Sequence, residues 1–222
     1  QTVDQANVTA YMKAKGFSDW ESLYKWSIEN PEVFWADQAA ELHWFKPWEK
    51  VRDWNPPYVK WFVGGKTNIV YNALDRHMGT PVQDRVAFYW ESEAGEQKAV
   101  SYRQLYLEVN RFASALKKLG IKKGDRVVIY LPRIPEQIVA MLAVARIGAV
   151  HSVVFSAFTA RALKQRVEDA EAVAVICTDG YQYAGKLVEK KADVDEGIEG
   201  TPVRHVIVVR RAGLDIPMKE GR

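Results

Sequence analysis

Short runs of β-branched and other apolar residues alternate with helical patterns through the second half of the chain, and this alternation constrains the fold more than any other feature. We expect strands at residues 126–131, 150–155, 173–177 and 205–209. Helices are expected between them, at residues 136–147, 160–169 (after an N-cap at Thr159) and 184–194. Such alternation forms right-handed βαβ units, so the sequence predicts an α/β fold with a mainly parallel sheet.

A further group of elements precedes these strands. Residues 68–77 are expected to form a helix, and residues 85–91 and 97–100 a pair of strands around a turn. Ser101 has the chemistry of an N-cap, with Gln104 three residues later, so a long helix should run from there to Gly120. We assign residues 67–222 to one α/β part.

The residues before this part are rich in tryptophan. The chain has eight tryptophans, and the last of them is Trp90. Short helical patterns between residues 8 and 61 are interrupted by Pro31, Pro47 and Pro56-Pro57. Residues 1–66 are therefore expected to form an irregular, partly helical segment that wraps its large rings over another domain. Stacking of the rings on bases is disfavoured, because many acidic residues lie among them.

Charge and composition exclude several classes of protein. The 31 basic and 28 acidic residues give a net charge of +3 and are intermixed, which is a poor nucleic-acid footprint. One cysteine excludes a disulfide framework and a cysteine-rich metal site. The sequence has neither the roughly 18 uninterrupted apolar residues of a membrane span nor a secretory signal. A soluble, cytoplasmic protein is expected, with neither nucleic acid nor membrane as its partner.

The two ends of the chain suggest a piece of a longer protein. The chain opens at Gln1 without a methionine and closes at Arg222, directly after a glycine, in a polar stretch. Such an end resembles a cut by a trypsin-like protease in an exposed loop, and a processed product or a chosen boundary is the alternative. We expect a fragment.

A search for catalytic motifs finds little. The fourteen glycines form no phosphate-binding loop of the Walker or dinucleotide type, and no two histidines have metal-ligand spacing. His151 and Cys177 lie in apolar strand patterns, where each is expected to be a core residue.

The carboxyl ends of the expected strands are better candidates, because ligands of open parallel sheets bind there. After the second strand, the segment Phe155-Ser156-Ala157-Phe158 combines two rings with small residues just ahead of a helix. A flat ring system could stack on these rings while backbone N–H groups meet an anion. The alternative, which the chemistry alone favours, is a turn whose small residues let the helix pack closely.

Several segments nevertheless form a recognisable set. They are Trp61-Phe62-Val63-Gly64-Gly65-Lys66-Thr67-Asn68-Ile69 with Asp75-Arg76-His77, Ser101-Tyr102-Arg103-Gln104-Leu105, Leu119-Gly120-Ile121-Lys122-Lys123-Gly124-Asp125, Val139-Ala140-Met141-Leu142-Ala143, and Ala145-Arg146-Ile147-Gly148-Ala149-Val150-His151-Ser152-Val153-Val154-Phe155. Together they resemble the N-terminal part of the acetyl-coenzyme A synthetase family, from about Trp20 to Arg211. This family belongs to the acyl-adenylate-forming (AMP-binding) ligases, so the resemblance implies part of the large domain of such a ligase.

The resemblance implies a two-step reaction. A carboxylate such as acetate attacks the α-phosphate of ATP to give an acyl-adenylate and pyrophosphate, and the thiol of coenzyme A then displaces AMP. In the family the ATP and Mg²⁺ sites, the acyl pocket and a mobile lysine all lie downstream of this segment. The chain is thus expected to be the first third or so of an acetate–CoA ligase, to contain no catalytic residue and to be inactive alone.

The resemblance places part of the coenzyme A site inside this segment. The family's Phe-Gly-Gly-Phe motif falls on Phe155, Ser156, Ala157 and Phe158, so both rings are kept and both glycines are replaced. Its Arg-Ala-Gly-Arg motif, whose guanidinium groups meet the 3′-phosphate, has Tyr183 and Lys186 in place of the arginines. Lys186 can meet a phosphate as a point charge, without the bidentate geometry of arginine.

A second hypothesis is a non-enzymatic α/β module that binds coenzyme A, a related nucleotide or a partner subunit. Four strands alone would leave an open apolar sheet edge. We therefore expect the chain to associate with the missing C-terminal part of the enzyme or with itself.

Overall fold

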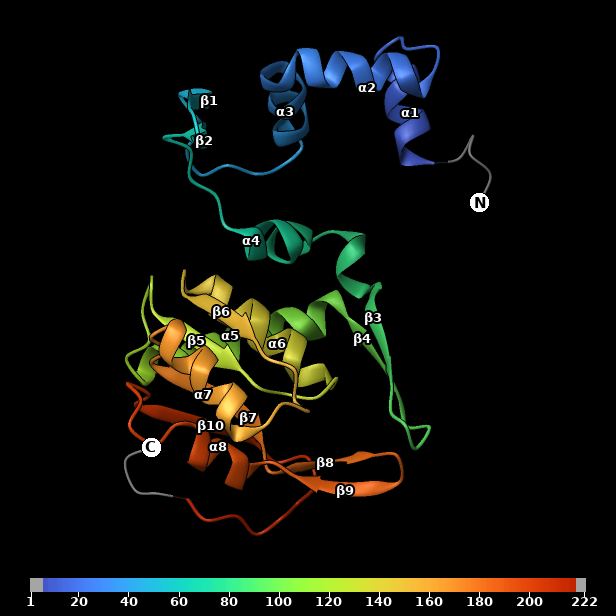
Figure 1. The fold of residues 1–222 in the computed structure, drawn as a ribbon. Helices are drawn as coiled ribbons and strands as arrows, with labels where there is room; N and C mark the ends of the chain where they lie inside the picture. The colour runs from blue at the N-terminus through green and yellow to red at the C-terminus, as the bar shows by residue number, and fades with distance from the viewer. Residues whose placement is uncertain (1–5, 219–222) are drawn as a thin grey trace. The chain divides into compact units, whose positions relative to one another are not determined.

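The structure, a computed structural model, describes residues 6–218 in two compact units that divide between Thr67 and Asn68. We call them the N-terminal unit and the sheet unit, and Figure 1 traces the chain through both. Gln1 and Arg222, on which the expectation of a fragment rests, lie outside the described residues.

The N-terminal unit contains helices followed by a hairpin. The helices are α1 (Asn7–Ala14), α2 (Trp20–Glu29) and α3 (Pro31–Ala40), and the antiparallel strands are β1 (Lys50–Asn55) and β2 (Tyr58–Val63). Asp19 caps α2 by accepting a hydrogen bond of 2.8 Å from the Ser22 N–H, and Pro31 occupies the first turn of α3. The helical patterns and their interruption at Pro31 are confirmed, whereas the hairpin is not part of the sequence prediction.

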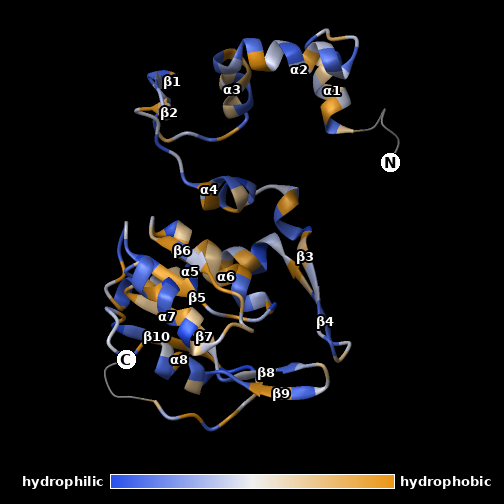
Figure 2. Cartoon of the chain, in the orientation of Figure 1, coloured by the Kyte–Doolittle hydropathy of each residue, from blue (hydrophilic) through white to orange (hydrophobic). Residues whose placement is uncertain are grey.

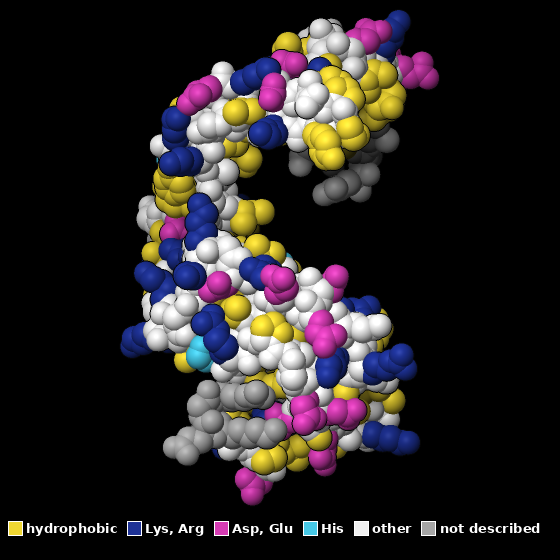
Figure 3. Space-filling model, turned by 60° about the vertical axis from the view of Figure 1, so that its left-hand side comes forward, with side chains coloured by type: hydrophobic (Ala, Val, Ile, Leu, Met, Phe, Trp, Pro, Cys, Tyr) yellow, Lys and Arg dark blue, Asp and Glu magenta, His cyan; other side chains and the backbone are white. Residues whose placement is uncertain are grey.

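Aromatic rings of the N-terminal unit pack on one another. The ring centroids of Trp44, Trp48 and Phe62 are separated by 5.0, 5.4 and 5.3 Å. A Cβ atom at Gly65 would lie 2.6 Å from the Trp44 ring, so glycine is required there. Among the described residues of the unit, few apolar side chains are enclosed, and several rings, coloured yellow in Figure 3, remain at the surface. Coverage of another domain by these rings stays a prediction.

The sheet unit opens with short helical segments and a hairpin. These are α4 (Ile69–Ala73), the 3₁₀ helices η2 (Asp75–His77) and η3 (Pro81–Asp84), and the antiparallel strands β3 (Val86–Glu91) and β4 (Gln97–Ser101). The long helix α5 (Tyr102–Lys118) follows directly. The Gln104 N–H donates to the Ser101 hydroxyl at 3.2 Å, and the Ser101 N–H donates to the Gln104 side chain at 2.9 Å. The reciprocal cap predicted for this helix is therefore confirmed.

Four parallel strands form the centre of the sheet unit. They are β5 (Arg126–Ile129), β6 (Val150–Val153), β7 (Ala174–Thr178) and β10 (His205–Val209), in the spatial order β10-β7-β5-β6. The connections carry α6 (Pro135–Arg146), α7 (Ala160–Asp169) and α8 (Lys191–Gly197). The predicted α/β class and parallel sheet are thus confirmed. None of the described helices has the length and apolar character that crossing a membrane requires.

Each face of this sheet builds its own hydrophobic core. Val127 and Ile129 pack with side chains of α5 and α6, whereas Val128 packs with side chains of α7 and α8. Neighbouring residues of β5 therefore enter opposite cores, as the alternation of a strand demands. Because both faces are covered, β5 and β7 are mainly apolar, which Figure 2 shows in orange and pale colours.

The helix predicted for residues 184–194 is wrong over its first half. Residues 180–189 form an antiparallel hairpin of β8 (Gly180–Tyr183) and β9 (Lys186–Glu189), and α8 begins only at Lys191. Ala184 and Gly185 make the two-residue turn with φ values of 50° and 70°. Glycine adopts this left-handed conformation freely, and it ends any helical run through residue 185.

The outer strands of the described sheet are β6 and β10. On β6, Val150 and Val153 are 54% and 45% exposed. The sheet therefore has an apolar edge at β6, as the count of strands in the sequence predicts.

Candidate functional site

The candidate site lies where the parallel strands end. β5 pairs with both β6 and β7, so the carboxyl ends of these three strands are neighbours. Tyr130 follows β5, the segment Phe155–Phe158 follows β6, and Asp179 follows β7. Ligands of open α/β sheets bind in the crevice beyond this edge.

The turn after β6 carries four of the predicted site residues. The rings of Phe155 and Phe158 stand at 89° to each other with centroids 5.8 Å apart, and they are 59% and 36% exposed. The Phe158 N–H donates to the Phe155 carbonyl at 3.0 Å and closes the turn. Of the two residues between them in the sequence, Ser156 is buried and Ala157 is exposed. The two rings form an apolar shelf at the surface, which can stack on a flat ligand.

Buried side chains support this shelf from below. Tyr130 is fully buried, and its hydroxyl donates to the Phe158 carbonyl. The ammonium group of Lys190, also buried, lies 2.7 Å from the Asp193 carboxylate and 3.4 Å from the Tyr130 hydroxyl. The backbone of the shelf is therefore fixed by a side-chain network rather than left as a free loop.

The protonation of this network follows from its surroundings. Burial works to lower the pKa of Lys190, but the hydrogen bond that its ammonium donates to Asp193 and the nearby charges outweigh it, so the pKa lies above its ordinary value. Burial also raises the pKa of Tyr130, although the Lys190 ammonium opposes this. Lys190 thus stays cationic and Tyr130 keeps the proton that it donates to Phe158.

Arg166 adds positive charge at the same place. Its guanidinium carbon lies 4.4 Å from the centroid of the Phe158 ring, in a cation–π contact. The shelf thus combines an apolar surface with a cation, which suits a ligand that carries both a ring and negative charge.

Tyr183 and Lys186 lie on the β8–β9 hairpin. They face each other in register at its turn, and both are exposed. The base of the hairpin reaches the shelf, because the Ser156 hydroxyl is 3.4 Å from the Tyr181 hydroxyl. The six predicted residues are therefore on two segments at one edge of the sheet, with Tyr183 and Lys186 at the projecting end of the hairpin (Figure 1).

The hairpin turn is also anchored to an earlier part of the chain. The Ala184 N–H donates to the Glu93 carboxylate at 2.9 Å. Near the same β3–β4 turn, the Arg211 guanidinium lies 2.8 Å from Glu96 and 4.8 Å from the centroid of the Trp90 ring. These contacts hold the end of the hairpin at a defined position.

Asp179 joins the elements that surround the site. Its buried carboxylate accepts hydrogen bonds of 2.8–3.0 Å from the N–H groups of Gly180, Arg211, Ala212 and Leu214. Burial works to raise the pKa of Asp179, but these backbone hydrogen bonds outweigh it and hold the pKa well below its usual range. The start of the hairpin and the segment after β10 are thus fixed to the end of β7.

Sequence reasoning missed Tyr130, Arg166 and Lys190, and it gave Asp179 no role. The sequence gives only two signals for the pair of Tyr130 and Lys190. Tyr130 ends an apolar strand, and Lys190 lies three residues before an aspartate. Both signals are common in proteins, so contacts across the fold are needed to give them meaning.

The described residues offer little for bond-making chemistry. Burial raises the pKa of the Cys177 thiol to about 12, so it is not a nucleophile at neutral pH. Within residues 6–218, no group of three or more His, Cys, Asp and Glu side chains could hold a metal ion. The apolar shelf and its neighbouring cation suit the binding of a ligand.

Comparison with known families gives the candidate site a context. Residues 74–220 match the family model of AMP-binding enzymes, and residues 20–73 match that of the acetyl-coenzyme A synthetase N-terminus. The chain therefore belongs to the AMP-binding enzyme family, and within it to the N-terminal portion of the acetyl-coenzyme A synthetase group.

Individual relatives agree with this assignment. Acetyl-coenzyme A synthetase of Methanothrix thermoacetophila is 49% identical over 99% of this chain and 34% of its own length. 3-hydroxypropionyl-coenzyme A synthetase of Sulfurisphaera tokodaii is 51% identical over 90% of this chain and 31% of its own length. The structure of acetoacetyl-CoA synthetase from Streptomyces lividans superposes with a TM-score of 0.89 at 29% identity, covering 98% of this chain and 35% of that one. The chain thus spans about a third of the length of these relatives.

Proposed function

We propose that the chain forms the amino-terminal third of a cytoplasmic, AMP-forming ligase that makes acetyl-CoA from acetate, ATP and coenzyme A through an acetyl-adenylate. The observation that carries this proposal is the unbroken match of residues 20–220 to two adjoining family models. The relatives are named for acetyl, 3-hydroxypropionyl and acetoacetyl groups, which makes a short carboxylic acid the substrate class.

In this proposal the carboxyl edge of the sheet contributes part of the coenzyme A site. The Phe155 and Phe158 rings give the adenine a stacking surface, and the closed turn holds Ser156 and Ala157 beside them. Lys186, exposed at the hairpin turn, supplies a point charge to a phosphate. Tyr183, its partner across the turn, would border the nucleotide with a ring in place of a charge.

ATP and Mg²⁺ belong to the proposed reaction but not to the described residues. These residues have no carboxylate cluster for a metal ion, and no phosphate loop occurs in the sequence. We therefore assign no step of the adenylation to this segment, and we expect the chain alone to form no acetyl-CoA.

A chimera tests the proposed activity. The matching first third of the Methanothrix enzyme is replaced by this chain, and ATP-dependent acetyl-CoA formation is measured. The chimera should be active, because the identity of 49% preserves the cores that support the rest of the domain. A chimera that folds, by circular dichroism and a cooperative thermal transition, yet forms neither acetyl-CoA nor another short acyl-CoA would contradict the proposal.

Calorimetric titration with coenzyme A tests the proposed binding edge separately. In the active chimera, Lys186→Ala should weaken binding by about tenfold at low salt and by less at high salt, because salt screens an exposed charge. Lys118→Ala, an exposed lysine on α5, is the matched control and should leave the affinity unchanged. Equal affinities for wild type and Lys186→Ala would remove Lys186 from the site without affecting the proposed reaction.

A further inference from the structure

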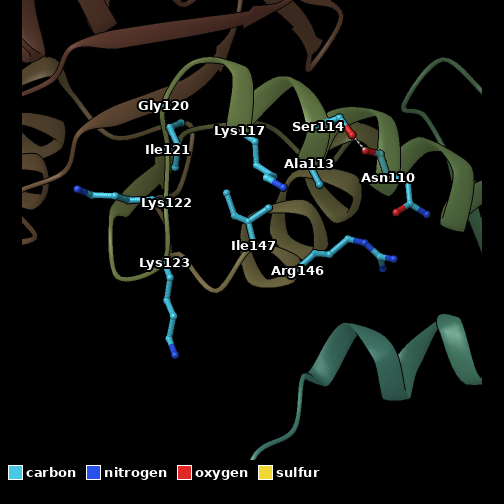
Figure 4. A pocket seen from close by; sticks show the side chains of 10 residues that line it. All are labelled: Asn110, Ala113, Ser114, Lys117, Gly120, Ile121, Lys122, Lys123, Arg146 and Ile147. Carbon is cyan, nitrogen blue, oxygen red and sulfur yellow. Dashed lines mark hydrogen bonds between the residues drawn. The ribbon is translucent and has the colours of Figure 1, made fainter. Parts of the chain in front are cut away.

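A second hollow lies at the opposite, amino-terminal edge of the parallel sheet. It is formed by the end of α5, the loop before β5 and the last turn of α6, just ahead of the points where β5 and β6 begin. Its volume is about 630 Å³, which is within the range of small-molecule sites. We call it the basic pocket; Figure 4 shows its lining of Asn110, Ala113, Ser114, Lys117, Gly120, Ile121, Lys122, Lys123, Arg146 and Ile147.

The charged side chains of this lining are all cationic. They are Lys117, Lys122, Lys123 and Arg146, and the lining includes no aspartate or glutamate. Arg146 is neutralised, because its terminal nitrogens each lie 2.7 Å from an oxygen of the Asp75 carboxylate. Among the described residues, no such ion pair is found for the three lysine ammonium groups. Three positive charges therefore remain.

The negative ends of two helices offset only part of this positive charge. α5 and α6 both end at the pocket, and each helix C-terminus carries about −0.5 of a charge, so together they offset about one of the three. Lys117 lies in the last turn of α5, so the negative end of this helix partly balances its charge. Lys122 and Lys123 lie in the loop beyond α5, where the buried Asp125 carboxylate offsets about one further charge, so a surplus of about one positive charge is left.

The backbone that carries these lysines is well fixed. The Lys122 N–H donates to the buried Asp125 carboxylate at 2.9 Å, and the Gly124 N–H donates to the Gly148 carbonyl at 3.0 Å. The stem of Lys123 passes so close to Gly148 that a Cβ atom there would lie 3.0 Å from its Cγ. The positions from which the lysines extend are thus set by the fold.

The wall opposite this loop supplies neutral polar groups and a fixed guanidinium. In Figure 4, Lys117 lies over the space between α5 and α6, on the side of Arg146 and Asn110, while Lys122 and Lys123 extend outwards from the loop. Lysine has a long flexible stem, so these two ammonium groups can turn to a ligand held at Lys117. Asn110 and Ser114 complete the wall beside it.

We propose that the basic pocket binds a phosphate dianion, either free phosphate or the phosphate of a small phosphorylated metabolite. The three lysine ammonium groups give the pocket a net positive charge, and a phosphate monoester is an anion of that opposite sign at neutral pH. The pocket is larger than a phosphate ion, so the remaining volume can hold the organic part of an ester. This proposal does not rest on the proposed ligase function.

Titration of the 222-residue chain tests this site. Inorganic phosphate is added at constant ionic strength, adjusted with chloride, and the amide NMR signals of residues 117–123 are followed. We expect saturable shifts in these signals with a dissociation constant of about 1 mM or below. Ribose 5-phosphate serves as the ester probe: tighter binding than phosphate assigns the site to a phosphorylated metabolite, and equal binding assigns it to free phosphate.

Charge variants identify the residues that bind. Lys117→Gln/Lys123→Gln should raise the dissociation constant by at least about tenfold. Lys118→Gln/Lys60→Gln removes the same charge from exposed positions outside the pocket and should change it less than about twofold. Arg146 is left intact because its ion pair with Asp75 is part of the fold. Equal weakening in both double variants, or no saturable shift with either phosphate probe, would overturn the proposal; thermal unfolding of each variant verifies that it is folded.

Discussion

Asp179 shows how one buried carboxylate can join the elements at the carboxyl edge of the sheet. Its four backbone donors come from the hairpin start and from the segment after β10, two regions far apart in sequence. Hydrogen bonds to an ionised group are stronger than neutral ones, and donors that lose such a partner remain buried without another. The stability of the fold therefore depends more on this side chain than on that of an exposed acidic residue.

Asp179→Asn should lower the free energy of unfolding by about 2–3 kcal/mol, because the amide has one acceptor oxygen and presents an NH₂ group to backbone donors. Urea unfolding at pH 7 measures the change. Asp215→Asn, at an exposed position of the same C-terminal segment, is the control and should stay within about 0.5 kcal/mol of wild type. A loss no greater than that of the control would show that the four hydrogen bonds contribute little.

The same carboxylate gives the stability a defined pH dependence. The folded-state pKa of Asp179 lies below the unfolded value of about 3.9, so its contribution is fully present above that value and is lost as the pH falls through the folded pKa. The stability difference between wild type and Asp179→Asn should thus be constant from about pH 5 to 8 and should shrink below about pH 4. A constant difference down to about pH 2.5 would contradict this account.

At the scale of elements, the β8–β9 hairpin has a strained turn. Ala184 has φ of 50°, a left-handed conformation that costs a non-glycine residue roughly 1–2 kcal/mol. Ala184→Gly relieves this strain but adds backbone entropy to the unfolded chain, so we expect a gain in stability of up to about 1 kcal/mol. Ala99→Gly, in the exposed strand β4, should instead destabilise the protein. Chemical denaturation of both variants gives the comparison, and destabilisation by Ala184→Gly would refute the argument.

The hairpins mark the limit of what the sequence predicts at this scale. β10 and the cap of α5 are found where they are predicted, because a β-branched run and a Ser-x-x-Gln pattern are local signals. The segment 184–194 contains residues that favour helices, and its true structure depends on a single glycine at the turn. In β1–β2, prolines and tryptophans obscure the alternation that identifies a strand.

The candidate site likewise combines features that local sequence signals predict with features that only the fold brings together. Phe155 and Phe158 can be found from sequence because they end a strand pattern, and their association in one turn is local. The contacts of Phe158 with Tyr130, and of Tyr130 with Lys190, join residues that are far apart in the chain. No spacing rule connects such residues, so this support of the shelf is visible only in the folded structure.

At the scale of the whole molecule, the two units differ in how much they bury. The described part of the N-terminal unit encloses Leu23 and Ala39, whereas the sheet unit has two cores with many fully buried side chains. Local stability follows the burial of apolar contacts. Amides of α2 and α3 should therefore exchange with deuterium faster than those of α6 and β5.

Hydrogen exchange followed by mass spectrometry of peptic peptides measures this difference. α5, a long helix of the sheet unit, is the internal reference, because its own helical hydrogen bonds resemble those of α2 but its apolar face is buried. Equal protection of α2 and α5 in the 222-residue chain would contradict the prediction and would mean that the exposed rings of the N-terminal unit are covered in solution.

The strand order β10-β7-β5-β6 has a consequence for synthesis on the ribosome. β5 emerges first, β6 can then pair on one side of it, β7 on the other, and β10 on the free side of β7. Each new strand adds to an edge that already exists, and none has to enter between two strands that are already paired. The sheet can therefore grow outwards in the order in which its residues are translated, which limits how long an incomplete chain exposes unpaired apolar strands.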